Sequence, residues 1–241
     1  TNISSTAINN NLSYKSLELY SHAGITTNYS FMFKNINTMS DNSVKYKNTP
    51  QSELMSAYFF DVTLPLQKIT KDRQNKLTPK LKFGISPHEM KNHNSTDRRV
   101  NINNVFSSNR LGLGDSYETG ESLTIGIDFK KEKINQLEKV VEVEGARIDY
   151  EILTDSEIEK QLKGVSNFKK EVVTEIEEYF DLKLATVFRF NKEEDIPKNS
   201  TINEKTSNIF GLVGYKPTKN TLLNYDFSLT NDLNTIEHQT I

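Results

Sequence analysis

Apolar and polar residues alternate with a period of two along most of this chain, in segments of about ten residues separated by polar turns. In the segment 25–34, Tyr29, Phe31 and Phe33 fall on one face, whereas Asn28 and Ser30 fall on the other. Successive side chains of a β-strand point to opposite sides of a sheet, so this period predicts a strand with one apolar face. The pattern recurs in segments that begin at Leu54, Leu77, Leu123, Phe180, Ile209 and Leu223.

Together with a weaker segment at 12–20, these patterns predict an all-β, antiparallel fold with about eight strands. The strands are close to the roughly 9–11 residues that cross a bilayer at a tilt, whereas soluble strands average about five to six residues. Pro65 and Pro79 lie inside two of the segments. Because proline cannot donate a hydrogen bond to a neighbouring strand, those strands are expected to start, bulge or fray there.

The strand length and the aromatic residues near strand ends favour a partial transmembrane β-barrel over a soluble sandwich. Outer-membrane barrels carry aromatic girdles at both interfaces, short turns on one side and long loops on the other. Segments 35–53 and 191–207 are predicted to be long polar loops, and segments 68–76 and 216–220 to be short turns. A secreted adhesive β-protein remains an alternative at this point, as does a porin or substrate-specific channel. The aromatic residues in question are Tyr20, Phe33, Phe129, Phe180, Phe190 and Tyr215.

The composition excludes several classes of function. With 30 basic and 32 acidic residues, the chain has no excess of positive charge with which to meet nucleic acid. No apolar run approaches the roughly 18 residues of a membrane-spanning helix. There is no cysteine, and the four histidines are too scattered to predict a metal site. No nucleophile elbow, phosphate loop or zinc-binding motif is present, so the sequence predicts neither an enzyme nor a cofactor.

Residues 131–179 break the alternation and are rich in Glu and Lys. We expect a charged insertion outside the membrane, with a hairpin that turns at Glu144 and Gly145 and a short helix that ends at Gly164. The chain begins Thr-Asn-Ile-Ser-Ser, without Met or an export signal, which favours an internal piece of a longer protein.

The most distinctive stretch, residues 97–126, is called the signature segment below. Its motif residues, in chain order, are Asp97, Arg98, Arg99, Asn104, Phe106, Asn109, Arg110, Gly112, Asp115, Glu118 and Gly120, followed by Ser-Leu-Thr-Ile-Gly at 122–126. This order resembles the C-terminal barrel of the LptD (OstA/Imp) family, which assembles lipopolysaccharide at the bacterial surface. The runs 77–80, 183–189 and 225–233 are similar to the alphaproteobacterial branch, so the resemblance covers most of residues 54–130 and 180–241.

The resemblance implies that residues 1–241 are the C-terminal portion of a larger barrel in the outer membrane of a Gram-negative bacterium. It implies lipopolysaccharide and outer-membrane lipid as partners, with periplasmic bridge proteins that deliver the lipid and an LptE-like plug lipoprotein inside the barrel. The lipid would leave through a lateral gate between the first and last strands. The charged insertion and the lack of cysteine depart from the family, so disulfide control does not carry over.

A physical reading of the signature segment concerns its charges. Arg98, Arg99 and Arg110 lie close in sequence to Asp97, Asp115 and Glu118, between two strands with lipid-facing patterns. Charges are costly in lipid unless they face a lumen or water. We therefore expect an ordered loop that folds toward the barrel interior through Arg–carboxylate pairs, because the guanidinium fork suits bidentate contact. A solvated surface loop is the alternative.

Overall fold

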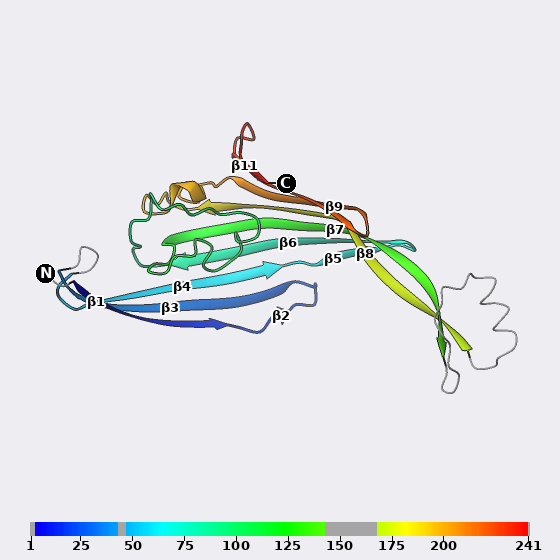
Figure 1. Cartoon of the computed structure of the whole chain (residues 1–241), viewed down its shortest axis with the longest axis horizontal. Coiled ribbons are helices and arrows are strands. Elements are labelled where there is room, and N and C mark those ends of the chain that lie inside the picture. The colour runs from blue at the N-terminus through cyan, green and yellow to red at the C-terminus, as the bar shows by residue number, and fades with distance from the viewer. Residues whose placement is uncertain (1–2, 43–46, 143–167, 241) are drawn as a thin grey trace.

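The computed structural model describes residues 3–42, 47–142 and 168–240. The prediction of an all-β, antiparallel fold is confirmed: the chain forms one 11-stranded antiparallel sheet (Figure 1). Its strands are β1 (Ser4–Lys15), β2 (Leu19–Tyr20), β3 (Thr26–Asp41), β4 (Gln51–Thr63), β5 (Leu66–Ile69), β6 (Arg73–Ser86), β7 (Gly120–Glu142), β8 (Phe168–Arg189), β9 (Ile209–Thr218), β10 (Thr221–Leu229) and β11 (Ile236–Thr240).

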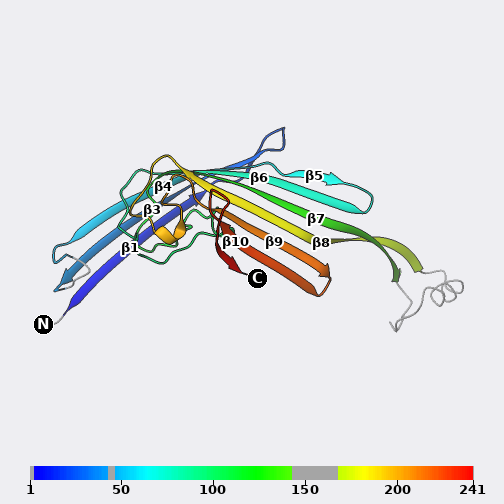
Figure 2. The ribbon, with the colours of Figure 1, turned by 90° about the horizontal axis from the view of Figure 1, so that it is seen from above.

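Neighbouring strands follow one another in the order β1-β3-β4-β6-β7-β8-β9-β10-β11, so the sheet is a meander. The two short strands prolong their predecessors, since β2 pairs with β3 and β5 pairs with β6. The interruption between β4 and β5 contains Pro65, as expected, and there the amide of Leu64 donates to the carbonyl oxygen of Pro79 at 3.1 Å. The sheet is twisted and open, and within the described residues β1 and β11 each leave one edge unpaired (Figure 2).

The long loop predicted at residues 35–53 is shorter in the structure, because β3 continues to Asp41 and β4 begins at Gln51. Asn35 pairs with Asn10 on one side and with Leu54 on the other, so its backbone belongs to two ladders. Asn35 also donates to the side chain of Ser52 at 3.2 Å, and Ile36 is buried against a neighbouring strand. Pairing with β1 on one side and β4 on the other thus extends β3 beyond the apolar residues from which the strand was predicted.

The charged segment 131–179 also begins and ends differently from the expected insertion. Strands β7 and β8 continue past a register shift at Lys131/Glu132 and form eleven further pairs, from Glu132↔Glu178 to Glu142↔Phe168. Figure 1 shows this paired extension projecting beyond the rest of the sheet. Opposite charges at Lys133↔Glu177 are compatible with pairing across strands. The expected turn at 144–145 and the expected helix ending at Gly164 lie outside the described residues.

The two faces of the sheet differ in what covers them. The polar face, which carries residues such as Lys34, Lys82, Thr124 and Arg189, is overlaid by the β6–β7 loop (residues 87–119) and the β8–β9 loop (residues 190–208). These loops bury a core that also includes strand residues: Met90, Val100, Ile102, Val105, Leu111, Leu113, Ala185, Val187, Ile196, Ile202, Phe210 and Leu212.

The apolar face, by contrast, is uncovered by any part of the described chain. Tyr58, Ile125 and Tyr215 are 50%, 43% and 47% exposed although they lie in the middle strands or near them. The only helical element described is a short 3-10 helix, η1 (Lys198–Ser200), in the β8–β9 loop. Within the described ranges, no helix has the length and hydropathy needed to cross a membrane.

Candidate functional site

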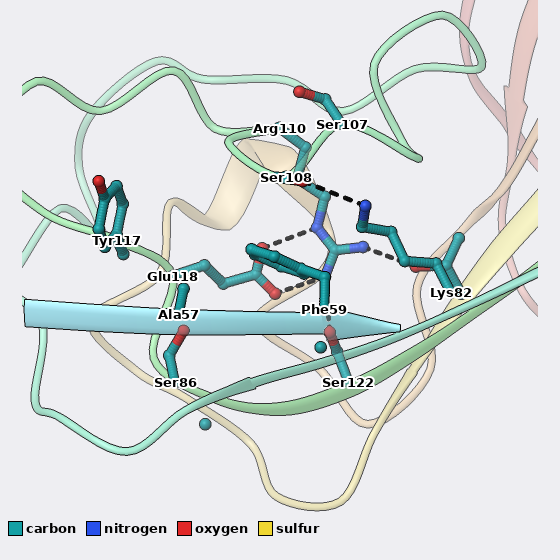
Figure 3. A pocket seen from close by; sticks show the side chains of 13 residues that line it. Ala57, Phe59, Lys82, Ser86, Ser107, Ser108, Arg110, Tyr117, Glu118 and Ser122 are labelled. Carbon is teal, nitrogen blue, oxygen red and sulfur yellow. Dashed lines mark hydrogen bonds and ion pairs between the residues drawn. The ribbon is translucent and has the colours of Figure 1, made fainter. Parts of the chain in front are cut away.

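Arg110 anchors the β6–β7 loop to the polar face of the sheet. Its side chain is only 5% exposed and forms a two-pronged ion pair with Glu118 of the same loop, in which Nε donates to Oε2 at 2.7 Å. Nη1 donates to the hydroxyl of Thr124 at 2.9 Å, and Nη2 to that of Ser122 at 3.1 Å. Figure 3 shows Arg110 and Glu118 facing each other above the sheet.

Glu118 also binds a second guanidinium, that of Arg189 at the end of β8. Arg189 Nη1 lies 2.5 Å from Glu118 Oε1, and its Nη2 donates to the carbonyl oxygen of Thr119. Burial alone would raise the pKa of Glu118, but the charges and hydrogen bonds of Arg110 and Arg189 outweigh it and hold that pKa below its ordinary value. One carboxylate therefore joins the loop before β7 to the end of the neighbouring strand β8.

An aromatic contact places the tip of the same loop. Phe106 lies directly over Gly126 of β7, and a Cβ atom at Gly126 would come within 2.7 Å of the Phe106 ring and 2.9 Å of the carbonyl oxygen of Leu184. Such separations are shorter than real Cβ contacts allow, so only glycine fits between the ring and the strand. The Leu-Thr-Ile-Gly run of the signature segment thus includes a docking position for its own phenylalanine.

Lysines on the polar face hold the loop from the other side. Lys34 of β3 donates to the carbonyl oxygen of Gly114 at 2.7 Å, and its ammonium lies 4.7 Å from the ring centroid of Tyr117. Lys82 of β6 pairs with Asp61 at 3.2 Å and also donates to Ser108 of the loop at 3.2 Å, as drawn in part in Figure 3. The loop is therefore tied to strands on both sides of β6 and β7.

Two histidines strengthen these ties. The amide of Ser56 in β4 donates to Nδ1 of His88 at 3.4 Å, and burial lowers the pKa of that imidazole, which keeps it an acceptor. His93 Nε2 lies 3.1 Å from Asp115 Oδ1 within the same loop, and among the described residues no arginine forms an ion pair with this carboxylate.

The structure divides the predicted residues into a buried group and an outer group. Arg110, Glu118 and Phe106 meet at the polar face, and Gly120 begins β7 at a φ of 80°, where a side chain would meet Arg189. Asp97 and Arg99 lie at the surface, 3.7 Å apart, and Arg98 is exposed. The others shape turns: Asn104 bonds the backbone of Asn101 and Arg99, the carbonyl of Asn109 accepts from the amide of Gly112, and Gly112 has a φ of 60°.

Arg189, Lys34 and Lys82 were not among the predicted site residues. Each nevertheless lies at a polar position of a strand that the alternation had identified; Arg189, for example, alternates with Phe188 and Phe190. A charged residue at an inward position of such a strand was the available signal. Its partner Glu118 comes from a loop about 70 residues away, and nothing in the sequence reveals that pairing.

The arrangement around Arg110 fits a clamp better than a reaction centre. The space between Glu118, Arg110 and the strands has a volume of about 20 Å³, enough for a water molecule but not for a substrate. In the described part of the chain, no group of three or more His, Asp or Glu residues is placed to hold a metal ion. The ion pairs of Arg110 and Arg189 with Glu118 instead hold the β6–β7 loop on the polar face of the sheet.

No family model matches the chain, and no curated protein matches it either. The likeness of the signature segment to the LptD family therefore rests on the motif residues alone.

Proposed function

We propose that this chain is a segment of an outer-membrane β-barrel, with its apolar face against lipid and its polar face toward the interior. The observation that carries the proposal is the inverted distribution of side chains over the two faces. A soluble sheet buries its apolar face and leaves its polar face to water. Here Lys82, Thr124 and Arg189 of the polar face are buried under loops, while Tyr58 and Ile125 of the apolar face are exposed.

The dimensions of the apolar face support a membrane location. On β7 the outward positions are apolar between Glu121 and Lys131, and the apolar residues are Leu123, Ile125, Ile127 and Phe129. Ten residues at a rise of about 3.3 Å span roughly 33 Å, which a strand tilt of about 40° reduces to roughly 25 Å. This matches the height of about 25 Å that the lipid-facing band of such barrels has.

Aromatic residues gather in the paired rows near both ends of this stretch. In the row of paired residues that contains Glu121, Tyr14 and Phe31 stack with ring centroids 5.4 Å apart. At the other limit, Phe129 and Phe180 make an edge contact at 6.2 Å, and the ammonium of Lys131 lies 5.7 Å from the Phe180 ring. Aromatic belts with lysines beside them are typical of membrane–water interfaces.

Within that setting, we propose that the full protein translocates lipopolysaccharide and inserts it into the outer leaflet, as the LptD family does. The order of motif residues in the signature segment supports this, and so does the ion pair of Arg110 with Glu118 on the side of this loop that contacts the sheet. Lipopolysaccharide, outer-membrane lipid, periplasmic bridge proteins and an LptE-like plug lipoprotein are the proposed partners, and no catalysis is proposed.

The other functions considered from the sequence explain less of this geometry. A general porin keeps a wide aqueous lumen, whereas two loops and an apolar core overlie the polar face here. A secreted adhesive β-protein would have to bury the apolar face, which nothing in the described chain covers.

Two experiments test the proposal in turn. The full-length protein should fractionate with the outer membrane and migrate faster on gels before heating than after, as folded barrels do; recovery in the soluble fraction would contradict the barrel. Depletion of the protein should then reduce lipopolysaccharide at the cell surface, measured with an antibody on intact cells. Unchanged surface display in depleted cells would refute the transport role while leaving the barrel in place.

A further inference from the structure

A group of basic side chains lies on the apolar face, just beyond the last aromatic residues of the band on β7. These residues come from β5, β6 and β7 and are called the basic cluster below: Lys68, Arg73, Lys131 and Lys133. On β7, Lys131 and Lys133 continue the alternation to which Phe129 belongs, so they lie on the outward face. Arg73 is paired with Lys133, while Asn75 is paired with both Lys68 and Lys131. The four residues therefore occupy two successive outward rows of the sheet.

Like charges also meet on the inward face, where the chain neutralises them. Lys76 and Lys130 are directly paired, and like charges at such positions destabilise the pairing of two strands. Lys76 Nζ, however, lies 3.0 Å from a carboxylate oxygen of Glu132. Lys130 Nζ lies 2.7 Å from a carboxylate oxygen of Glu178. The repulsion between the two inward lysines is thus compensated within the chain.

The outward pair of Arg73 and Lys133 lacks this compensation. The side chain of Arg73 is 63% exposed, and its one ion pair among the described residues is with its neighbour Asp72, at 3.4 Å. Lys133 forms no ion pair within the described ranges, although Glu177 is paired with it across the strands. The ammonium of Lys133 lies instead 5.4 Å from the ring centroid of Tyr179. An anion from outside the chain would offset the repulsion between these two cations.

Lys131 places a third cation at the edge of the apolar band. Its ammonium lies 5.6 Å from the ring centroid of Phe129 and 5.7 Å from that of Phe180, and it forms no ion pair with a described residue. Lys68 is exposed and is also without a carboxylate partner in the described part of the chain. A ligand that extends from the band to the basic cluster would therefore meet apolar side chains first and cations at its end.

The opposite limit of the band carries no such cations. The row that contains Glu121 has no basic residue among the described strands from β1 to β7, and its other members are Tyr14, Phe31, Tyr58 and Ile85. The long loops 87–119 and 190–208 follow at that limit, whereas the basic cluster lies beside the short turn at residues 70–72. Outer-membrane barrels keep their short turns on the periplasmic side. In the proposed barrel, the basic cluster therefore faces the periplasmic leaflet.

We infer that the basic cluster binds the phosphate group of an anionic phospholipid in the periplasmic leaflet. The acyl chains of this lipid lie along the apolar positions of β7, and its phosphate reaches Arg73, Lys131 and Lys133. Arginine can contact two phosphate oxygens at once, and lysine contributes a point charge. A free phosphate ion has similar charge but cannot use the apolar band, so the geometry favours the lipid. The inference rests on the proposed barrel, but not on the transport of lipopolysaccharide.

Native mass spectrometry of the full-length protein in detergent micelles provides the test. The probes are phosphatidylglycerol and phosphatidylcholine with the same acyl chains, so that only the head group differs. We expect tighter binding of phosphatidylglycerol, because the choline cation of the other lipid is repelled by the basic cluster. Arg73→Gln combined with Lys133→Gln should weaken binding of phosphatidylglycerol about 25-fold, at about fivefold for each cation, and leave binding of phosphatidylcholine unchanged. Lys131→Gln alone should weaken binding of phosphatidylglycerol about fivefold.

The matched control removes two exposed cations from the long loops. Arg98→Gln combined with Lys205→Gln lowers the net charge by the same amount and should change binding of phosphatidylglycerol by less than about twofold. The inference is overturned if the two lipids bind equally, if the control weakens binding as much as the double substitution does, or if inorganic phosphate at the same concentration displaces phosphatidylglycerol.

Gel migration before heating separates this inference from the barrel on which it rests. Each variant should migrate as the folded natural protein does, because the substituted side chains are on the surface. A protein that migrates as a folded barrel but shows no preference for phosphatidylglycerol refutes the lipid site alone. Recovery of the natural protein in the soluble fraction refutes the barrel itself.

Discussion

Replacing Arg110 with alanine should release the β6–β7 loop from the sheet. The substitution removes the two-pronged pair with Glu118 and the hydrogen bonds to Ser122 and Thr124, and leaves Glu118 with Arg189 as its only guanidinium. Breaking a buried ion pair by removing one partner costs about 3–5 kcal/mol when the remaining charge is left uncompensated. Because Arg189 still pairs with Glu118, we take the lower end of that range, about 3 kcal/mol. At about 1.4 kcal/mol per tenfold change, this favours loop opening by a factor of about 100 or more.

Proteinase K digestion of the folded full-length protein in micelles measures this opening. When opening and closing are fast relative to cleavage, the cleavage rate follows the population of the open form. Arg110→Ala should therefore be cut within residues 87–119 about 100 times faster than the natural protein, and assembly of the barrel in cells should be impaired. Arg98→Ala removes an exposed arginine from the same loop and should change the rate less than twofold.

A double-mutant cycle separates the ion pair from a general loss of packing. The variant Glu118→Gln should also speed cleavage, but its combination with Arg110→Ala should cost less than the sum of the two single changes by about 0.5–3 kcal/mol. Additive effects, or an Arg110→Ala protein that resists protease and assembles with normal envelope permeability, would refute the clamp.

Three other substitutions or conditions test the remaining contacts. Gly126→Ala should destabilise the folded protein by about 1–3 kcal/mol, seen as a lower urea midpoint, because the added Cβ collides with Phe106 and a strand carbonyl; an unchanged midpoint would contradict the close packing. The stabilisation from Glu118 is present above its unfolded pKa of about 4.3 and is lost as pH falls through its lower folded value, so the natural protein should weaken below about pH 4 and Glu118→Gln should weaken less. Ile125→Arg, in the middle of the apolar band, should lower barrel stability in lipid by about 2–4 kcal/mol, whereas Ile176→Arg, at a somewhat more exposed isoleucine on the β8 extension, should cost little; equal losses would argue against a lipid-facing band.

The sequence predicted the strands best where apolar residues alternate. The outward positions of β7 from Leu123 to Phe129 followed a clear period of two, and that strand was placed correctly. The extension of β3 beyond residue 34 was missed because Asn35 and Asn37 lack the composition of a strand and are held by hydrogen bonds to β1 and β4. Pairing with neighbours overrides weak local preference, and a single sequence contains no record of those neighbours.

The type of contact in the candidate site could be predicted from the sequence, but not all of the residues that form it. Arg110 and Glu118 were expected to be part of a loop with Arg–carboxylate pairs, and the structure places them together. Arg189 was missed because its carboxylate partner is distant in the sequence, and Asp115 lies beside His93 and not beside an arginine. Local charge density indicated that pairing occurs, whereas the choice of partner depends on how the strands are arranged.

The carboxylate of Glu118, which pairs with both Arg110 and Arg189, also favours one register of β8 against β7. A slip of β8 by one residue would turn Arg189 toward the uncovered apolar face and bring Phe188 or Phe190 beneath the loop, since neighbouring side chains lie on opposite faces. Glu118 would then keep a single guanidinium, that of Arg110, and Arg189 would lose its carboxylate partner among apolar side chains. A misaligned β8 would therefore leave charges unpaired, and this cost favours the observed register of β8 against β7.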